Sequence, residues 1–205
     1  RKKTGLDCGM MVACGNIDNI KITAVASDFD FLGASMASAE GEAFLYGIQH
    51  AIENQNPFLC ISAGGGMRMM ESLISLSQMS RTSLAINELK KNNLPYLVCI
   101  TDPTAGGITA SYAMLGDIHI AEPGALIAFA GARVIQGTVK EELPEGFQKS
   151  EYVEKTGFVD LIVERKFLSE KIGTLLSILL KKNSAISTER NEITENTQSL
   201  SKVAS

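Results

Sequence analysis

Hydrophobic and polar residues alternate with two different periods along this chain, and the change of period predicts strands and helices in turn. Short apolar runs bounded by Gly, Pro, Asn or Asp are typical of buried strands. Residues 1–19 are mixed and contain glycine, so we expect an entry segment there. The predicted strands are 20–27, 28–35, 57–62, 94–101, 117–122, 125–131 and 159–163.

Helical periodicity fills the intervals between these strands. Ser38 can cap a helix that runs to about Asn54, in which Phe44, Ile48 and Ile52 recur at four-residue spacing. The other predicted helices are 67–89, a short one that follows Gly107 and ends at Gly116, 133–143, 150–157 and 166–182.

The predicted helix 67–89 is unusual because it carries few charges. Between Met67 and Asn87 the only charged residues are Arg68, Glu71 and Arg81. Surface helices usually carry a charged stripe, so this one is expected to be covered on most sides. In a domain of this size, full cover indicates a partner subunit.

The alternation of strands and helices predicts an α/β fold with a mainly parallel sheet and crossover connections. No internal boundary is visible, so we expect a single core domain over residues 1–182. Residues 183–205 are polar and poor in apolar side chains, which is typical of a disordered tail.

Composition narrows the class of protein. The chain has 205 residues, of which 45% are apolar and 20% charged, as in ordinary globular domains. A formal net charge of −4 without a basic block argues against a nucleic-acid surface. No apolar run is long enough to span a membrane, and the N-terminus has no signal core.

The four cysteines are Cys8, Cys14, Cys60 and Cys99. They lack the close pairs of a zinc ribbon, and two of them lie in apolar strand-like runs. We therefore expect reduced structural thiols, a cytoplasmic location and no metal bound by this chain.

Two glycine clusters follow two of the predicted strands. They are Gly64–Gly66 after strand 57–62 and Gly106–Gly107 after strand 94–101. Such turns are often structural only, and neither cluster has the spacing of a nucleotide-binding loop. At a helix N-terminus, however, unpaired N–H groups and the helix dipole attract an oxyanion, and glycine lets it approach. The two clusters therefore predict two oxyanion holes made of backbone alone.

A specific resemblance is carried, in order, by SAGGGMRM, LPYLVCITDPTAGGITASYAMLGDIHIAEPGALIAFAGARVI and LPEGFQKSEYVEKTGFVDLIV. These segments resemble the carboxyltransferase β subunit of bacterial acetyl-CoA carboxylase, from about Lys2 to about Leu180. The resemblance implies a crotonase-like (ClpP/crotonase) fold of ββα units stacked in a superhelix.

The resemblance also implies a reaction. The carboxyl group of carboxybiotin, held on biotin carboxyl carrier protein, passes to acetyl-CoA and gives malonyl-CoA for fatty acid biosynthesis. The implied partners are the carboxyltransferase α subunit, in an α2β2 assembly, and biotin carboxylase. The backbone donors for the thioester and ureido oxygens would be Gly65, Gly66, Gly106 and Gly107.

This chain departs from the family pattern at several positions. The family usually has an upstream four-cysteine zinc ribbon, so either the ribbon was removed with the missing start or this member lacks it. Near the motifs, the departures are Gly64 for Ser, Met67 for Ala, Met70 for Gln and Ala132 for Pro. Met67 enlarges a side chain beside the first glycine cluster and is expected to reshape the acyl pocket.

Three arginines are candidates for binding CoA phosphates or the partner subunit, Arg68, Arg81 and Arg133. Arg68 lies beside the first glycine cluster and is the best placed. An ordinary ion pair between Arg68 and Glu71, three residues along the same helix, is an equal alternative.

Two alternative functions come from other classes. The segment GGITASYAM also resembles the serine-bearing helix of Clp-type peptidases, with Ser111 as nucleophile. A hydrolase needs a base there, and the strand at 125–131 has no histidine; His50 and His119 are expected to be structural. The second alternative is a scaffold subunit that binds acyl-CoA without catalysing a reaction.

Overall fold

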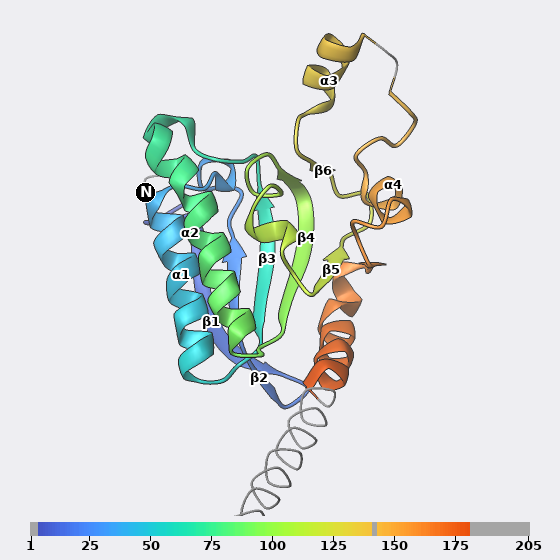
Figure 1. Ribbon diagram of the computed structural model, residues 1–205. Coiled ribbons are helices and arrows are strands. Elements are labelled where there is room, and N and C mark those ends of the chain that lie inside the picture. Colours follow the sequence, from blue (N-terminus) through green and yellow to red (C-terminus); the bar gives the residue numbers. More distant parts are fainter. Residues whose placement is uncertain (1–3, 141–142, 181–205) are drawn as a thin grey trace, which may run out of the picture.

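A single sheet organises the molecule. The computed structural model describes residues 4–140 and 143–180 (Figure 1). The sheet order is β1-β2-β3-β4-β5-β7, and β6 pairs with β4 off this path. β1 and β2 are antiparallel, whereas the other pairs are parallel. The strands are β1 Met10–Ile17, β2 Ile20–Ser27, β3 Phe58–Gly64, β4 Tyr96–Ala105, β5 Ile118–Ala121, β6 Ile127–Ala128 and β7 Leu161–Ile162.

The first two strand predictions were only half right. Strand β2 is confirmed, but residues 28–35 form a turn and the short 3-10 helix η1, Leu32–Ala34. Strand β2 pairs instead with β1, which lies in the segment that we expected to be an entry segment. Most of β1 is exposed, so it shows no apolar alternation, and its hairpin turns at Asp18 and Asn19, both with positive φ.

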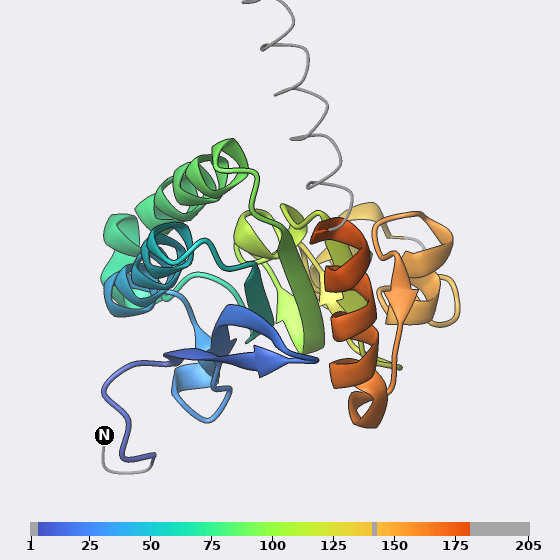
Figure 2. The same cartoon turned by 90° about the horizontal axis from the view of Figure 1, so that it is seen from below.

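The sheet is covered on two faces, and the alternation of its side chains explains how. Helix α1, Ser38–Glu53, buries Phe44 and Ile48 on one face with Phe58 and Tyr96. The helical residues 168–180 cover the opposite face (Figure 2). Residues 168–180 pack on Ile22, Leu59, Leu97 and Ile120. Leu59 and Leu97 directly follow Phe58 and Tyr96 in their strands, so their side chains point to the opposite face of the sheet.

Helix α2, Ser72–Lys91, packs mainly on α1 and begins later than predicted. Residues 65–68 are not helical, because Met67 forms a bridge with Met36 and Arg68 has an extended backbone. The one-turn 3-10 helix η2, Met69–Glu71, then leads into α2. Helical periodicity in the sequence continued through this segment and could not reveal the bridge.

The C-terminal half contains shorter elements than predicted. The helix expected after Gly107 is a series of turns that ends in the 3-10 helix η3, Tyr112–Met114. Helix α3, Ala132–Val139, stands away from the sheet, and α4, Ser150–Lys155, returns the chain to it (Figure 1). The 3-10 helix η4, Arg165–Phe167, precedes residues 168–180. The predicted tail, 183–205, lies outside the described residues.

Candidate functional site

The two glycine clusters lie side by side at one edge of the sheet. β3 and β4 are parallel neighbours, so their carboxyl ends deliver both clusters to the same place. A Cβ added to Gly106 would lie 3.2 Å from the Gly66 Cα, and one added to Gly66 would lie 3.4 Å from the Gly107 nitrogen. Gly66 and Gly106 also have positive φ, of 125° and 65°. Both the backbone conformation and the close approach therefore favour glycine at these two positions.

Some N–H groups in these loops are occupied within the fold. In the first glycine loop, residues 64–68, Gly65 donates to the Gly33 carbonyl at 3.3 Å. In the second glycine loop, residues 105–110, Gly106 donates to the Ala128 carbonyl at 3.0 Å. Of the four predicted donors, Gly65 and Gly106 are therefore engaged in holding the loops.

Other N–H groups in the same loops have no acceptor within the described part of the chain. They belong to Gly66 and Met67 in the first loop and to Gly107, Ile108 and Thr109 in the second. Partly buried N–H groups without an internal acceptor are available to a ligand oxygen. The sequence predicted Gly66 and Gly107 as backbone donors but did not predict Met67, Ile108 or Thr109, because an unpaired backbone N–H leaves no signal in the side chain.

The source of positive potential at the two glycine loops is not the helix N-termini that the sequence predicted. Neither loop opens directly into an α-helix, since α2 begins at Ser72 and η3 is a single 3-10 turn. The unpaired donors instead result from the glycine turns themselves, which keep successive N–H groups out of the sheet ladder.

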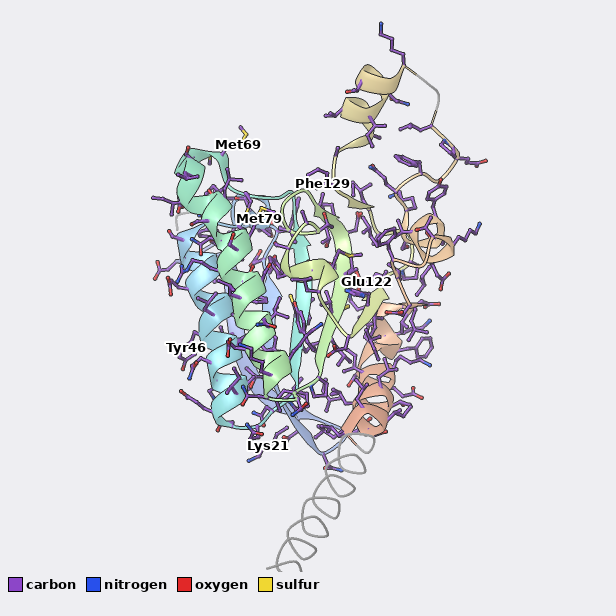
Figure 3. All side chains as sticks on the ribbon, in the orientation of Figure 1. Lys21, Tyr46, Met69, Met79, Glu122 and Phe129 are labelled. Carbon is purple, nitrogen blue, oxygen red and sulfur yellow. The ribbon has the colours of Figure 1, made fainter. Side chains whose placement is uncertain are left out.

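Met67 lies across the second glycine loop. A Cβ at Gly107 would come within 2.7 Å of Met67 Cγ and 3.2 Å of Met79 Sδ. Met79 belongs to α2 and is labelled in Figure 3, near the end of the sheet where the loops lie. Two methionine side chains, Met67 and Met79, thus border the second glycine loop at Gly107.

Arg68 is turned into the protein and its donors are occupied. It is 8% exposed, pairs with Glu40 at 2.8 Å and Glu71 at 3.1 Å, and donates to the carbonyl and hydroxyl oxygens of Ser35. Burial alone would lower the pKa of Arg68, but hydrogen bonds and charge from Glu40 and Glu71 raise it above its ordinary value. These contacts favour the ion-pair alternative over phosphate binding.

The other candidate side chains do not assemble into a hydrolytic triad. Ser111 Oγ donates to the Gly107 carbonyl at 2.6 Å, and no hydrogen bond joins it to a histidine in the described chain. His119 Nε2 accepts from the Gly116 N–H at 3.2 Å, and burial lowers the pKa of His119. His50 contacts Thr23 at 3.1 Å in the last turn of α1. Arg133 lies in the first turn of α3, and its side chain lies outside the described part.

A cavity of about 540 Å³ opens beside the second glycine loop. Thr109 and Ala110 line it on the loop side, and Phe129, Phe147 and Tyr152 line it on the side of β6 and α4. Its volume is in the range of small-molecule sites, and no Asp, Glu, Lys or Arg is among the described residues that line it. An uncharged or apolar group suits this cavity better than a phosphate.

Over most of its length, α2 exposes apolar side chains and buries polar ones. Ser75, Gln78 and Thr82 are buried against the fold, but Leu73 is 74% exposed and Leu84 is 66% exposed; only near its C-terminus do apolar residues, Ile86 and Leu89, face the core. Met69, just before the helix, is 87% exposed and projects outward (Figure 3). Apolar side chains gathered on the exposed side of a helix form an unpartnered interaction face.

The cysteines of the described residues are free thiols, as predicted. Cys60 and Cys99 are buried in β3 and β4, and burial raises the pKa of Cys99 to about 12. Within residues 4–140 and 143–180, no group of three or more metal-ligating side chains comes together. In the same residues, no helix is long and apolar enough to cross a membrane.

Comparison with solved structures identifies the fold. The Pseudomonas malonate decarboxylase MdcD-MdcE heterodimer matches with a TM-score of 0.74 at 21% identity, covering 84% of this chain and 78% of that one. Transcarboxylase 12S, with methylmalonyl-coenzyme A and methylmalonic acid bound, matches with a TM-score of 0.75 at 25% identity, covering 82% of this chain and 33% of that one. The predicted α/β, crotonase-like fold is confirmed.

Comparison with curated proteins identifies the family. The acetyl-coenzyme A carboxylase carboxyl transferase subunit beta of Pelagibacter ubique (strain HTCC1062) is 79% identical over all 205 residues. The protein of that name from Chelativorans sp. (strain BNC1) is 49% identical over 191 residues, or 93% of this chain. The chain spans 66% and 61% of the length of these relatives. The carboxyl transferase domain family matches residues 1–203, and the chain belongs to this family.

Proposed function

We propose that this chain is the acyl-CoA-binding part of a biotin-dependent carboxyltransferase, which carboxylates acetyl-CoA to malonyl-CoA. The main observation is that two loops with unpaired N–H groups meet at Gly66 and Gly107. Support also comes from the names of the relatives and from the coenzyme A thioester bound by transcarboxylase 12S. The proposal covers a chain that spans about two thirds of those relatives.

The proposed role of the donors is to stabilise charge on the thioester oxygen. When carboxybiotin releases its CO2, the biotin left behind would take the α-proton of acetyl-CoA, and the thioester would become an enolate whose oxygen is negative. The enolate carbon would then bond to the CO2. A backbone donor that is already oriented stabilises such an oxygen by roughly 2.7–4 kcal/mol in the transition state. Because the loops are adjacent, one donor from the Gly66–Met67 pair and one from Gly107–Thr109 can share a single oxygen.

This arrangement changes the number of oxyanion holes that the two loops are expected to form. Two glycine clusters in the sequence suggested two holes, but their contact favours one joint hole in this chain. Carboxybiotin would supply the carboxyl group, and a hole for its ureido oxygen would then come from the α subunit. The methionines beside Gly107 would limit the length of the acyl group.

The proposed partner surface is the apolar face of α2. An α subunit seated on Leu73 and Leu84 would cover the residues that the free chain exposes. The malonate decarboxylase with the same fold is a heterodimer, which supports pairing of this kind. Biotin carboxyl carrier protein, biotin carboxylase and a cytoplasmic location stay predictions from the sequence.

The two alternatives have less support. A Clp-type peptidase would need a base at Ser111, whose hydroxyl donates to a carbonyl instead. A scaffold without catalysis would retain the fold and the partner surface but would not need unpaired donors.

Reconstitution tests the proposal directly. The full-length protein is mixed with the α subunit and carboxylated carrier protein, and malonyl-CoA formation is followed. We expect turnover that requires both subunits. A complex that assembles and binds acetyl-CoA but forms no malonyl-CoA would instead favour the scaffold.

A further inference from the structure

A buried ion pair lies directly behind the first glycine loop. Glu40 is 1% exposed and Arg68 is 8% exposed, and Glu40 Oε1 accepts from Arg68 at 2.8 Å. The same carboxylate accepts from the Gly9 N–H at 2.9 Å and the Ala37 N–H at 3.1 Å. It therefore joins the segment before β1, the start of α1 and the end of the glycine loop.

The contacts of this pair enclose the free donors of the first loop. Met36 donates its N–H to the Gly66 carbonyl at 2.9 Å, and the Arg68 N–H donates to the Met36 carbonyl at 2.8 Å. The segment Gly66–Met67 is therefore fixed to Met36 by a backbone hydrogen bond at each end. The Arg68 side chain also binds Ser35, the residue before Met36, donating to its carbonyl at 2.8 Å and its hydroxyl at 3.1 Å.

We propose that the Glu40–Arg68 pair is a positioning device that sets where the Gly66 and Met67 N–H groups lie, so that both side chains are positioning residues for the proposed carboxyl transfer. This inference rests on the proposed function. Neither side chain needs to touch the substrate. Their contribution is to fix a loop whose glycines would otherwise leave it flexible.

Physical chemistry explains why a charged pair suits this role. The guanidinium presents donors in a rigid fork, and here they reach Ser35, Glu40 and Glu71 together. An apolar contact of the same size would be compatible with several loop positions, whereas this set of hydrogen bonds defines one. Removing Arg68 leaves the buried Glu40 charge without its cationic partner, and removing Glu40 leaves Arg68 with only the partly exposed Glu71 as a carboxylate partner.

The experiment uses the full-length protein reconstituted with its α subunit. Glu40→Gln keeps the shape but removes the charge, and Arg68→Lys keeps the charge but removes the fork. Glu164→Gln breaks the exposed Glu164–Lys166 pair, of 2.7 Å, as a control for loss of a carboxylate. Three quantities are measured on each: kcat and KM for acetyl-CoA, thermal melting, and the infrared carbonyl stretch of bound carbonyl-¹³C acetyl-CoA.

We expect kcat to fall roughly tenfold to a hundredfold in Glu40→Gln and Arg68→Lys, because a displacement of about 1 Å can cost that much. KM should change little, and the carbonyl band should move toward its frequency in free acetyl-CoA as the hydrogen bonds weaken. Glu164→Gln should match the wild type in all three.

Two results would overturn the proposal. One is an unchanged kcat in either folded variant. The other is a lower melting temperature and rate with the carbonyl band unmoved, which indicates a structural role only. If Glu40→Gln fails to fold, Arg68→Lys decides by the same criteria. Absence of turnover in the wild-type complex would refute the proposed function itself, and the carbonyl band would still report on the positioning of the donors.

Discussion

At the scale of residues, Gly107 illustrates how a glycine can be required without an unusual backbone. Its φ is not positive, yet a Cβ there would meet Met67 Cγ at 2.7 Å. The constraint at Gly107 thus comes from the neighbouring Met67 side chain and not from the turn. Gly66 and Gly106, in contrast, combine close approach with positive φ.

This difference predicts a rescue. Gly107→Ala should lower kcat by on the order of 10²-fold, because its methyl displaces Met67 and shifts the donor loop. Adding Met67→Ala should recover most of that loss, since it removes the crowding. Malonyl-CoA turnover checks both. Gly15→Ala, where nothing lies within 4 Å, is the control and should leave turnover unchanged. A double variant as slow as the single one would show that Gly107 is needed for another reason.

Glu71 gives a prediction for pH dependence. Hydrogen bonds from the Ser38 hydroxyl and N–H, with Arg68, hold the pKa of Glu71 below its ordinary value of 4.5. A lowered folded-state pKa contributes stability that is complete above the unfolded-state value and is lost as the pH falls through the folded-state value. The melting temperatures of wild type and Glu71→Gln should therefore differ most near neutral pH and converge as the pH falls below 4.5 and through the lowered folded-state pKa of Glu71. A constant difference at every pH would contradict this.

At the scale of elements, α1 and α2 have opposite relations to the core. α1 buries Phe44 among Phe58, Tyr96 and Tyr112, with ring centroids 4.9 to 6.5 Å apart. α2 instead directs Ser75 and Thr82 inward and leaves Leu73, Leu76 and Leu84 exposed, and of its leucines only Leu89 near the C-terminus is buried. The first helix stabilises the fold, whereas the second is suited to an assembly.

A substitution in α1 should therefore unfold the free chain. Phe44→Ala should cost about 3–5 kcal/mol of unfolding free energy, because it leaves a cavity in an aromatic cluster. Tyr46→Ala, at a position 64% exposed on the same helix, should cost less than about 0.5 kcal/mol. Urea denaturation of the purified chain measures both. Equal costs would mean that α1 does not pack on the sheet in this way.

A substitution on α2 should do the reverse. Leu73→Glu should leave the unfolding free energy within about 0.5 kcal/mol, because the side chain is exposed. Binding to the α subunit should weaken at least tenfold, as expected for a charge placed within an apolar interface. Light scattering and calorimetry with the α subunit report these effects. Met11→Glu, 60% exposed on β1, is the control, and equal weakening by both would place the interface elsewhere.

At the scale of the whole molecule, the parallel sheet brings distant segments to one edge. The glycine loops are about forty residues apart in the chain, yet β3 and β4 end side by side. The segment 33–37 and the carbonyl of Ala128 come from further elements and occupy the remaining N–H groups of the loops. The proposed site is therefore a property of the sheet edge and not of one motif.

Several features could be predicted because they depend on local sequence. Apolar runs located β2, β3, β4 and β5, and four-residue spacing located α1. The motifs around Gly65 and Gly106 led to the family and the crotonase-like fold, both now confirmed. The assignments of catalytic and substrate-binding residues, by contrast, stay predictions.

Tertiary structure decided the remainder, since those features depend on contacts between distant residues. Periodicity could not show that β1 pairs with β2, or that the bridge from Met36 delays the start of α2. Nor could it assign Arg68 to Glu40, which lies 28 residues earlier in the chain. Which glycine N–H groups are free depends on whether Gly33 and Ala128 accept from their neighbours. Local sequence thus shows where glycines leave the backbone uncovered, whereas contacts between distant residues settle which N–H groups keep no internal acceptor.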